Sequence, residues 1–125
     1  MTGTRTVNPQ LMTLLEIQDL RSKVRELRNE GGLEALEQEH FHIDPAEAIG
    51  RLESRIGDLE DELAPGIRRR YERVKDSLDR VVVPVINGVC YGCFVSIATA
   101  VAGDQDPNET VRSCETCGRI IYILS

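Results

Sequence analysis

Apolar residues recur every three or four positions along the first part of the chain, on an otherwise charged background. Between positions 9 and 30 they form one stripe, made of Leu14, Ile17, Leu20, Val24 and Leu27. This spacing places them on one face of an amphipathic helix. Asn8 and Pro9 are typical of a helix N-cap and first turn, while Gly31 and Gly32 are typical of a helix end. The pattern predicts a helix from Pro9 to about Glu30.

A second stripe follows residues 44–47, whose order Asp-Pro-Ala-Glu is that of an N-cap, a first-turn proline and a capping-box glutamate. Its members are Ile49, Leu52, Ile56, Leu59, Leu63, Ile67, Tyr71, Val74, Leu78 and Val81. Pro65 and Gly66 shift its phase and predict a kink or a short break. Two helices with one stripe each bury it by packing together. We therefore expect an antiparallel coiled-coil hairpin over residues 9–80, with residues 31–44 at its tip.

The pattern changes after Arg80. Residues 81–86 are mostly β-branched, Asn87 and Gly88 form a turn signal, and residues 94–98 and 119–124 are further short strand candidates. We expect a small antiparallel β module over residues 81–125. The polar, aperiodic residues 1–8 are predicted to be a flexible N-terminus. The fold class expected for the whole chain is α+β.

Two Cys-x2-Cys pairs, twenty residues apart, stand in the β module. Their members are Cys90, Cys93, Cys114 and Cys117. Each pair suits a tight turn that brings two sulfurs to one metal ion, and Gly92 and Gly118 supply a permissive backbone. The spacing predicts one structural zinc ion, because four thiolates leave no coordination position for water or substrate. An iron–sulfur cluster, a redox-active pair and unrelated buried cysteines are the alternatives.

The length of 125 residues suits one compact domain or two small modules, and aromatic residues make up only 4% of the chain. With so little to bury, the β module should depend on its metal for folding. No apolar run is long enough for a membrane span and the first ten residues lack the features of a signal peptide, so the cytoplasm is the expected location. Four cysteines in such a chain favour metal ligands over structural disulfides.

The net charge of −6 is unevenly distributed. Residues 31–67 carry ten acidic and two basic side chains, whereas residues 68–80 carry six basic and three acidic ones. The acidic total argues against nonspecific binding of nucleic acid or of anionic membranes by the whole molecule. The acidic side chains of the expected hairpin tip are interpreted as solvated groups that prevent association.

A basic patch stands directly before the β module. It consists of Arg68, Arg69, Arg70, Arg73 and Lys75, and Arg119 adds a further cation within the module. With Tyr91, Phe94 or Tyr122 as stacking surfaces, these cations could contact nucleic acid. A solvated helix face that pairs with neighbouring carboxylates is the plainer interpretation. Binding to the acidic segment of a second copy, which would make a homodimer, is another.

Two histidines, His40 and His42, lie near carboxylates in the expected tip. They are interpreted as exposed loop residues, with a second metal site as the alternative. No Ser-His-Asp set, nucleotide-binding loop or paired carboxylate motif is evident, so no catalytic residue is predicted.

The cysteine motifs and their surroundings resemble those of the bacterial C4-type zinc-ribbon proteins with an N-terminal coiled coil. The resemblance is carried by residues 14–20, 65–74, 83–85, 88–93 and 114–122. Members of that family commonly have a much longer hairpin than this chain. The resemblance implies a zinc-stabilised, non-enzymatic binding or adaptor protein that engages regulatory protein partners. Its alternative is an RNA- or DNA-binding regulator that uses residues 68–75 and the ribbon.

Overall fold

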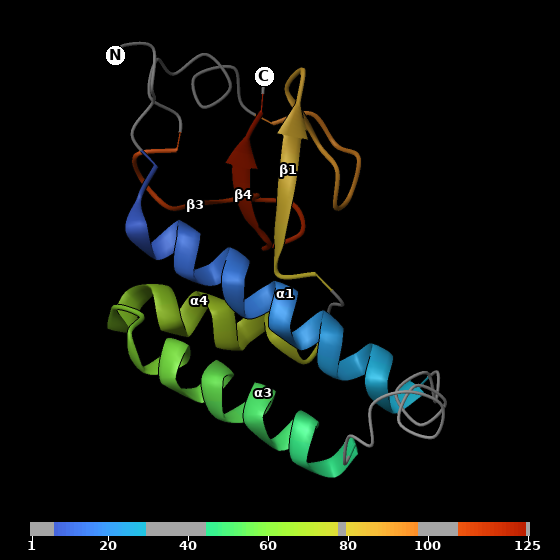
Figure 1. Ribbon diagram of the computed structural model, residues 1–125. Coiled ribbons are helices and arrows are strands. Elements are labelled where there is room, and N and C mark those ends of the chain that lie inside the picture. Colours follow the sequence, from blue (N-terminus) through green and yellow to red (C-terminus); the bar gives the residue numbers. More distant parts are fainter. Residues whose placement is uncertain (1–6, 30–44, 78–79, 98–107, 125) are drawn as a thin grey trace, which may run out of the picture. The chain divides into compact units, whose positions relative to one another are not determined.

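The computed structural model describes residues 7–29, 45–77, 80–97 and 108–124 (Figure 1). These residues form an α+β fold with three helices and four short strands. The helices are α1 (Pro9–Asn29), α3 (Pro45–Asp61) and α4 (Pro65–Lys75). The strands are β1 (Val82–Ile86), β2 (Val89–Cys90), β3 (Arg112–Ser113) and β4 (Ile120–Ile123). The predicted hairpin tip lies outside the described residues, as does the predicted flexible terminus apart from Val7 and Asn8.

The described residues form two compact units. The first joins the residues up to Leu15 with those from Leu63 onward, and the second consists of residues 16–62. Helix α4 therefore belongs to the same unit as the sheet, although the sequence assigned it to a helical segment over residues 9–80. Side-chain contacts explain this placement, because Arg70 Nη1 donates to the main-chain oxygen of Val111 at 2.9 Å. The predicted domain boundaries at residues 8 and 80 stay a prediction.

Helix α1 begins at Pro9, as predicted, and its described part extends to Asn29. The Asn8 side-chain oxygen accepts a hydrogen bond from the Gln10 main-chain N–H at 2.8 Å, which is the expected N-cap contact. The main-chain N–H of Asn8 donates to the main-chain oxygen of Asn108 at 2.8 Å. The first turn of α1 is therefore anchored to the loop that precedes β3.

The predicted interruption at Pro65 is confirmed, since α3 ends at Asp61 and α4 begins at Pro65. Ala64 has an extended backbone, with φ −62° and ψ 148°, as expected for a residue that precedes proline. Its N–H donates to Gln10 Oε1 at 2.6 Å. Helix α4 then buries Tyr71 and Val74.

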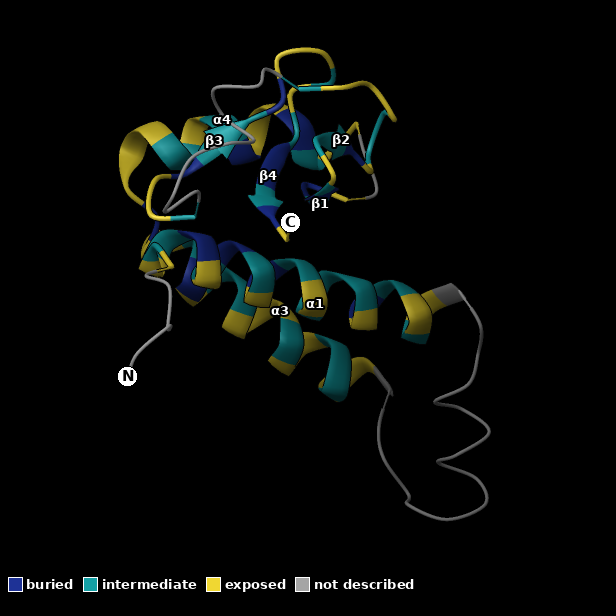
Figure 2. Ribbon diagram, turned by 90° about the horizontal axis from the view of Figure 1, so that it is seen from above, coloured by how far each residue is buried: buried dark blue, intermediate teal, exposed yellow. Residues whose placement is uncertain are grey.

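In the second unit, α3 lies beside the part of α1 that follows Leu15 (Figures 1 and 2). Ile17, Val24 and Leu59 are buried here, and they belong to the two stripes that the sequence predicted. Two ion pairs cross between the helices, Arg55 with Glu16 at 3.3 Å and Arg28 with Glu53 at 2.8 Å. All four side chains are about half exposed, so the apolar stripe contributes more to stability than these pairs.

The four strands form one mixed sheet in the order β2-β1-β4-β3. The outer pairs β1·β2 and β3·β4 are antiparallel, but the central strands β1 and β4 run parallel. The prediction of a purely antiparallel module is therefore wrong. Two antiparallel hairpins meet along β1 and β4, and the long connection between Ile86 and Ile120 allows the crossover that parallel strands need.

The strand predictions are partly confirmed. Strands β1 and β4 lie within the segments predicted at residues 81–86 and 119–124. Of the segment predicted at residues 94–98, the described residues 94–97 form only an isolated bridge between Ser96 and Val89, because they belong to the turn after Cys93. Strand β3 has two residues, Arg112 and Ser113, which are too few to produce a pattern.

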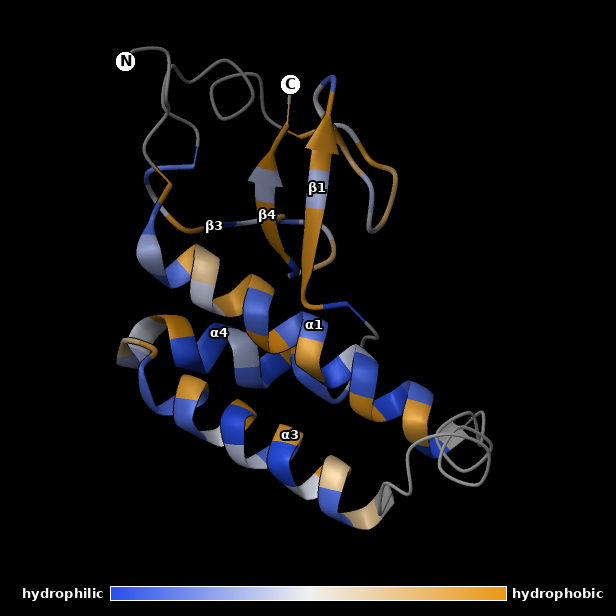
Figure 3. Cartoon of the chain, in the orientation of Figure 1, coloured by the Kyte–Doolittle hydropathy of each residue, from blue (hydrophilic) through white to orange (hydrophobic). Residues whose placement is uncertain are grey.

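The core of the first unit contains the central strands, which are apolar and buried along most of their length (Figures 2 and 3). One cluster holds Val83, Val85, Cys90, Cys114, Ile121 and Ile123. Val82 and Ile120 point to the opposite face and have no exposed surface. Two of the four cysteines thus form part of the core. Among the described helices, none has the length and apolar character needed to cross a membrane.

Candidate metal centre

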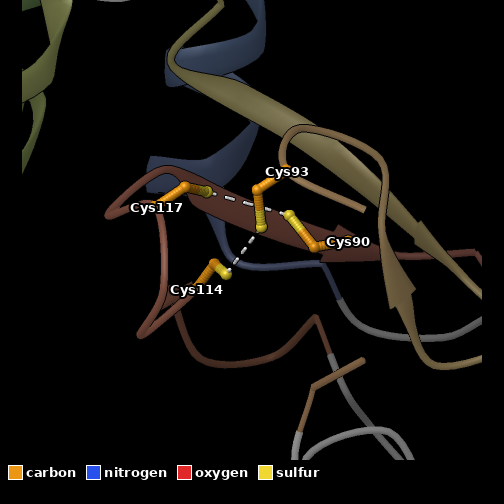
Figure 4. Close-up of side chains that lie close together, drawn as sticks. All are labelled: Cys90, Cys93, Cys114 and Cys117. Carbon is orange, nitrogen blue, oxygen red and sulfur yellow. Dashed lines mark hydrogen bonds between the residues drawn. The ribbon is translucent and has the colours of Figure 1, made fainter. Parts of the chain in front are cut away.

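The sheet brings the four cysteines together. Cys90 ends β2 and Cys93 follows in the next turn, while Cys114 follows β3 and Cys117 lies in the turn before β4. Their sulfur atoms all lie within 4.8 Å of one another (Figure 4). The closest distances join the two pairs, with Cys93 Sγ 3.7 Å from Cys114 Sγ and Cys90 Sγ 3.9 Å from Cys117 Sγ. The cysteines are free thiols, since a disulfide needs about 2.05 Å.

Both Cys-x2-Cys turns have the same main-chain hydrogen-bond pattern. In each, the N–H of the first cysteine donates to the carbonyl five residues later, and its carbonyl accepts from the N–H four residues later. The distances are 3.1 and 2.6 Å in the first turn, from Cys90 to Val95 and from Phe94 to Cys90. They are 2.8 and 2.8 Å in the second, from Cys114 to Arg119 and from Gly118 to Cys114. We call residues 90–95 the first knuckle and residues 114–119 the second knuckle.

The fourth residue after the first cysteine adopts a left-handed backbone in both knuckles. Gly118 has φ 78°, which confirms its predicted role. In the first knuckle this position holds Phe94, with φ 61°. Gly92 does not have a left-handed backbone, so the role predicted for it is wrong. Gly92 instead leaves space for Arg119, because a Cβ atom there would lie 2.7 Å from Arg119 Cδ.

The sulfur geometry fits one tetrahedral metal ion. A zinc ion with Zn–S bonds of about 2.3 Å places its sulfurs about 3.8 Å apart, close to the two shortest observed distances. Main-chain N–H groups also face the sulfurs. Gly92 N–H donates to Cys90 Sγ at 3.4 Å, Val95 donates to Cys93 and Arg119 donates to Cys117. Such donors favour the thiolate form that binds metal.

The thiols differ in their readiness to ionise. Burial raises the pKa of Cys90, and burial together with the neighbouring thiols raises the pKa of Cys93 to about 12. Burial also opposes ionisation of Cys117, but hydrogen bonds from the main chain and side chain of Arg119 outweigh it and lower this pKa to about 7. Metal binding must therefore displace protons from Cys90 and Cys93 at neutral pH.

The cations of the basic patch predicted from the sequence have different surroundings in the structure. Arg69, Arg70 and Arg73 line a groove of about 770 Å³ between α4 and the segment 111–118. Arg68 instead pairs with Glu72 at 3.2 Å, as in the plainer interpretation. The Lys75 ammonium lies 5.4 Å from the centre of the Tyr71 ring. A role of these cations in binding a partner stays a prediction.

The three predicted stacking residues lie on different elements of the module. Tyr91 and Phe94 are exposed on the first knuckle, with ring centres 5.5 Å apart. Tyr122 lies on β4 opposite Pro84 and is half-buried. His40 and His42 lie outside the described residues.

Arg119 has a place that the sequence did not predict. The sequence groups it with the basic patch, but Nε donates to the Arg80 main-chain oxygen at 3.0 Å, and the side chain lowers the pKa of Cys117. The available signal was the position of Arg119 directly after the Cys-x2-Cys-Gly motif. A residue at that position leaves the turn beside the sulfur of the motif's second cysteine.

No protein-family model matches the sequence, and no curated protein matches it significantly. The chain is similar to the solved structure of CT398 from Chlamydia trachomatis, with a TM-score of 0.48 and 28% sequence identity. The matched region covers 75% of this chain and 44% of that one. The chain therefore spans less than half the length of the matched protein.

Proposed function

We propose that the chain is a non-enzymatic adaptor protein whose C-terminal module is a zinc ribbon held by one structural zinc ion. The support for zinc is the set of four thiolates with distances near those of a tetrahedral site. A site saturated by protein ligands leaves no position for substrate, which favours a structural role. The exposed residues of the first knuckle, Tyr91, Phe94 and Val95, are aromatic or apolar.

One observation carries the assignment of a protein partner, namely the exposed aromatic residues of the first knuckle. Phe94 is 69% exposed, and Tyr91 and Val95 are also exposed. A left-handed backbone at a residue other than glycine costs about 1–3 kcal/mol. Gly118 fills the equivalent position of the second knuckle and avoids this cost. A role of Phe94 in binding a partner therefore explains the strained backbone better than a role in folding.

The sequence of the first knuckle favours a protein over nucleic acid, although Arg119 from the second knuckle lies against its Gly92. Residues 81–103 contain no Asp, Glu, Lys or Arg. Nucleic-acid binding depends mainly on cations that neutralise phosphates, and this stretch supplies none. An apolar protein surface suits Tyr91, Phe94 and Val95 better, because aromatic anchors in a desolvated centre dominate protein interfaces.

An affinity pull-down tests this proposal. Zinc-loaded wild-type protein would be compared with Phe94→Gly, and with Met12→Ala as a matched control, since Met12 is 57% exposed on α1. We expect one set of proteins to bind the wild type and the control but not Phe94→Gly. The same proteins, once purified, should lose affinity for Phe94→Gly in direct titration. Equal binding by all three would overturn the assignment.

The second candidate function is binding of RNA or DNA, and the groove lined by Arg69, Arg70 and Arg73 favours it. Arginine side chains in a groove suit phosphate groups. Arg69→Glu should then weaken binding at low salt and reduce its salt dependence, whereas Arg51→Glu on α3 should not. No binding at low salt, or equal binding by both variants, would remove this candidate.

We further propose that α1 and α3 form an antiparallel coiled-coil hairpin and that the protein acts in the cytoplasm. The ion pairs of Glu16 with Arg55 and of Arg28 with Glu53, and the buried stripe beside them, support the hairpin. A reducing compartment suits four free thiols. A second copy of the chain remains an alternative partner, which a measurement of molecular mass in solution would detect.

A further inference from the structure

The backbone of Arg119 is fixed by the second knuckle. Its carbonyl accepts the Cys114 N–H at 2.8 Å, and its own N–H donates to the Cys117 sulfur. The next residue, Ile120, pairs with Val82 in the centre of the sheet. The Arg119 side chain therefore starts from a position that the two cysteines and β4 determine together.

The side chain then crosses to the first knuckle. Nε donates to the Arg80 main-chain oxygen at 3.0 Å, and the guanidinium lies near the Cys117 sulfur, where it favours the thiolate form. The stem lies against Gly92, where a Cβ atom would lie 2.7 Å from Cδ and 3.0 Å from Nη1. One residue thus contacts both knuckles and the segment that leads into β1.

The charge of Arg119 is opposite to that of a loaded site. Four thiolates around one divalent zinc ion leave a net charge of about −2. The guanidinium is a permanent cation, and hydrogen bonds between ionised groups are stronger than those between neutral groups. Arg119 is half-buried beside Cys117, where solvent screens charges less than at the surface. Its guanidinium therefore compensates part of the negative charge of the loaded site.

We propose that Arg119 is a positioning residue of the metal centre, which retains the zinc ion by compensating thiolate charge and by bridging the two knuckles. This inference rests on the proposed zinc site. Gly92 takes part because only a residue without Cβ lets the arginine stem lie across the first knuckle. The pair of Arg119 and Gly92 therefore acts as one device, in which the glycine provides the space that the arginine occupies.

Metal release from the zinc-loaded full-length chain tests the inference. A chromogenic chelator in excess would report the release rate of the wild type and of Arg119→Met, Arg119→Lys and Gly92→Ala. Arg51→Met is the matched control, because it removes one arginine charge from an 80% exposed position on α3. Circular dichroism of the loaded proteins would verify that each variant is folded.

We expect Arg119→Met to release zinc about 10–100 times faster than the wild type, the usual range for loss of an outer contact to a metal ligand. Arg119→Lys keeps the charge but loses the planar fork, so its rate should lie between those of wild type and Arg119→Met. Gly92→Ala should also release zinc faster, because its Cβ displaces the stem. Arg51→Met should leave the rate unchanged.

The outcomes separate this inference from the proposed function. Release from Arg119→Met within twofold of the wild type would overturn the inference alone, as would equal rates for Arg119→Met and Arg119→Lys. If Arg119→Met does not fold, Arg119→Lys and Gly92→Ala decide, and wild-type rates in both would overturn the inference. A wild-type protein that binds no zinc would instead overturn the proposed metal centre, and the inference with it.

Discussion

Phe94 and Gly118 occupy equivalent positions in the two knuckles and share a left-handed backbone, with φ of 61° and 78°. Each donates its N–H to the carbonyl of the first cysteine of its knuckle, at 2.6 and 2.8 Å. The same turn is thus built once with the residue that tolerates this conformation and once with a residue that does not. This difference leads to a pair of opposite predictions.

Phe94→Gly should stabilise the metal-loaded protein. The substitution relieves a left-handed backbone at an exposed side chain, and we expect a gain of about 1 kcal/mol in the free energy of unfolding. Gly118→Ala should lose about 1–2 kcal/mol for the converse reason. The loss arises in the backbone, since the added Cβ would have ordinary contact with Val74 at 3.6 Å. Denaturant unfolding of the loaded proteins measures both changes, and destabilisation by Phe94→Gly would contradict the assignment of strain.

Removal of the metal should unfold the sheet before the helices of residues 16–62. The core cluster includes Cys90 and Cys114, so ionised or separated thiols disrupt the packing around Val83 and Ile121. Structural zinc sites supply much of the folding energy of small modules. Amide hydrogen exchange after chelation should show lost protection in β1 and β4 while α3 keeps its own. Cys114→Ser should give the same result without a chelator, and unchanged protection in β1 and β4 would refute the prediction.

Metal affinity should rise with pH. Cys93, with a pKa of about 12, and Cys90, whose pKa is also raised, hold protons at neutral pH that the metal must displace. Higher pH lowers the cost of losing each proton, so affinity increases by about tenfold per pH unit for each proton displaced. Cys117, with a pKa of about 7, adds to this dependence below pH 7. Competition titrations from pH 6 to 8 measure the slope, and affinity that falls as pH rises would disprove the sign.

Asn108 should be important for the end of β4. Its side-chain oxygen accepts the Ile123 N–H at 2.7 Å, and its amide donates to the Ile123 carbonyl at 2.9 Å. These two bonds replace the strand partner that Ile123 lacks on that side. Asn108→Ala removes both and should cost about 1–3 kcal/mol in the free energy of unfolding. Asn108→Asp retains only the acceptor, so it should also destabilise the protein, and thermal unfolding near that of the wild type would count against this role.

The helices and the ligand set could be predicted from the sequence because they depend on local signals. Proline with a preceding polar residue marked the start of α1 and α3, and Pro65 marked the break. The spacing of Cys90, Cys93, Cys114 and Cys117 was sufficient to predict that they meet.

The sheet topology and the surroundings of the sulfurs depend on contacts between distant residues, which local patterns do not encode. The parallel pairing of Val83 with Ile121 is one such contact, and the passage of Arg119 across Gly92 is another. Gly92 also shows how the residue type at one position can be misinterpreted. A glycine in a turn indicated backbone freedom, whereas its role in the structure is to leave space for a side chain.

The parallel pairing of β1 with β4 sets the order in which the C-terminal module forms during protein synthesis. β1, β2 and the first two cysteines are synthesised before β4. A two-stranded hairpin alone has marginal stability. Strand β1 gains its second neighbour, β4, only when residues 120–123 have been made. Until then Cys90 and Cys93 form half of a ligand set, and their thiols are open to oxidation or to the wrong metal. The metal centre can thus be completed only after the second knuckle has also been synthesised.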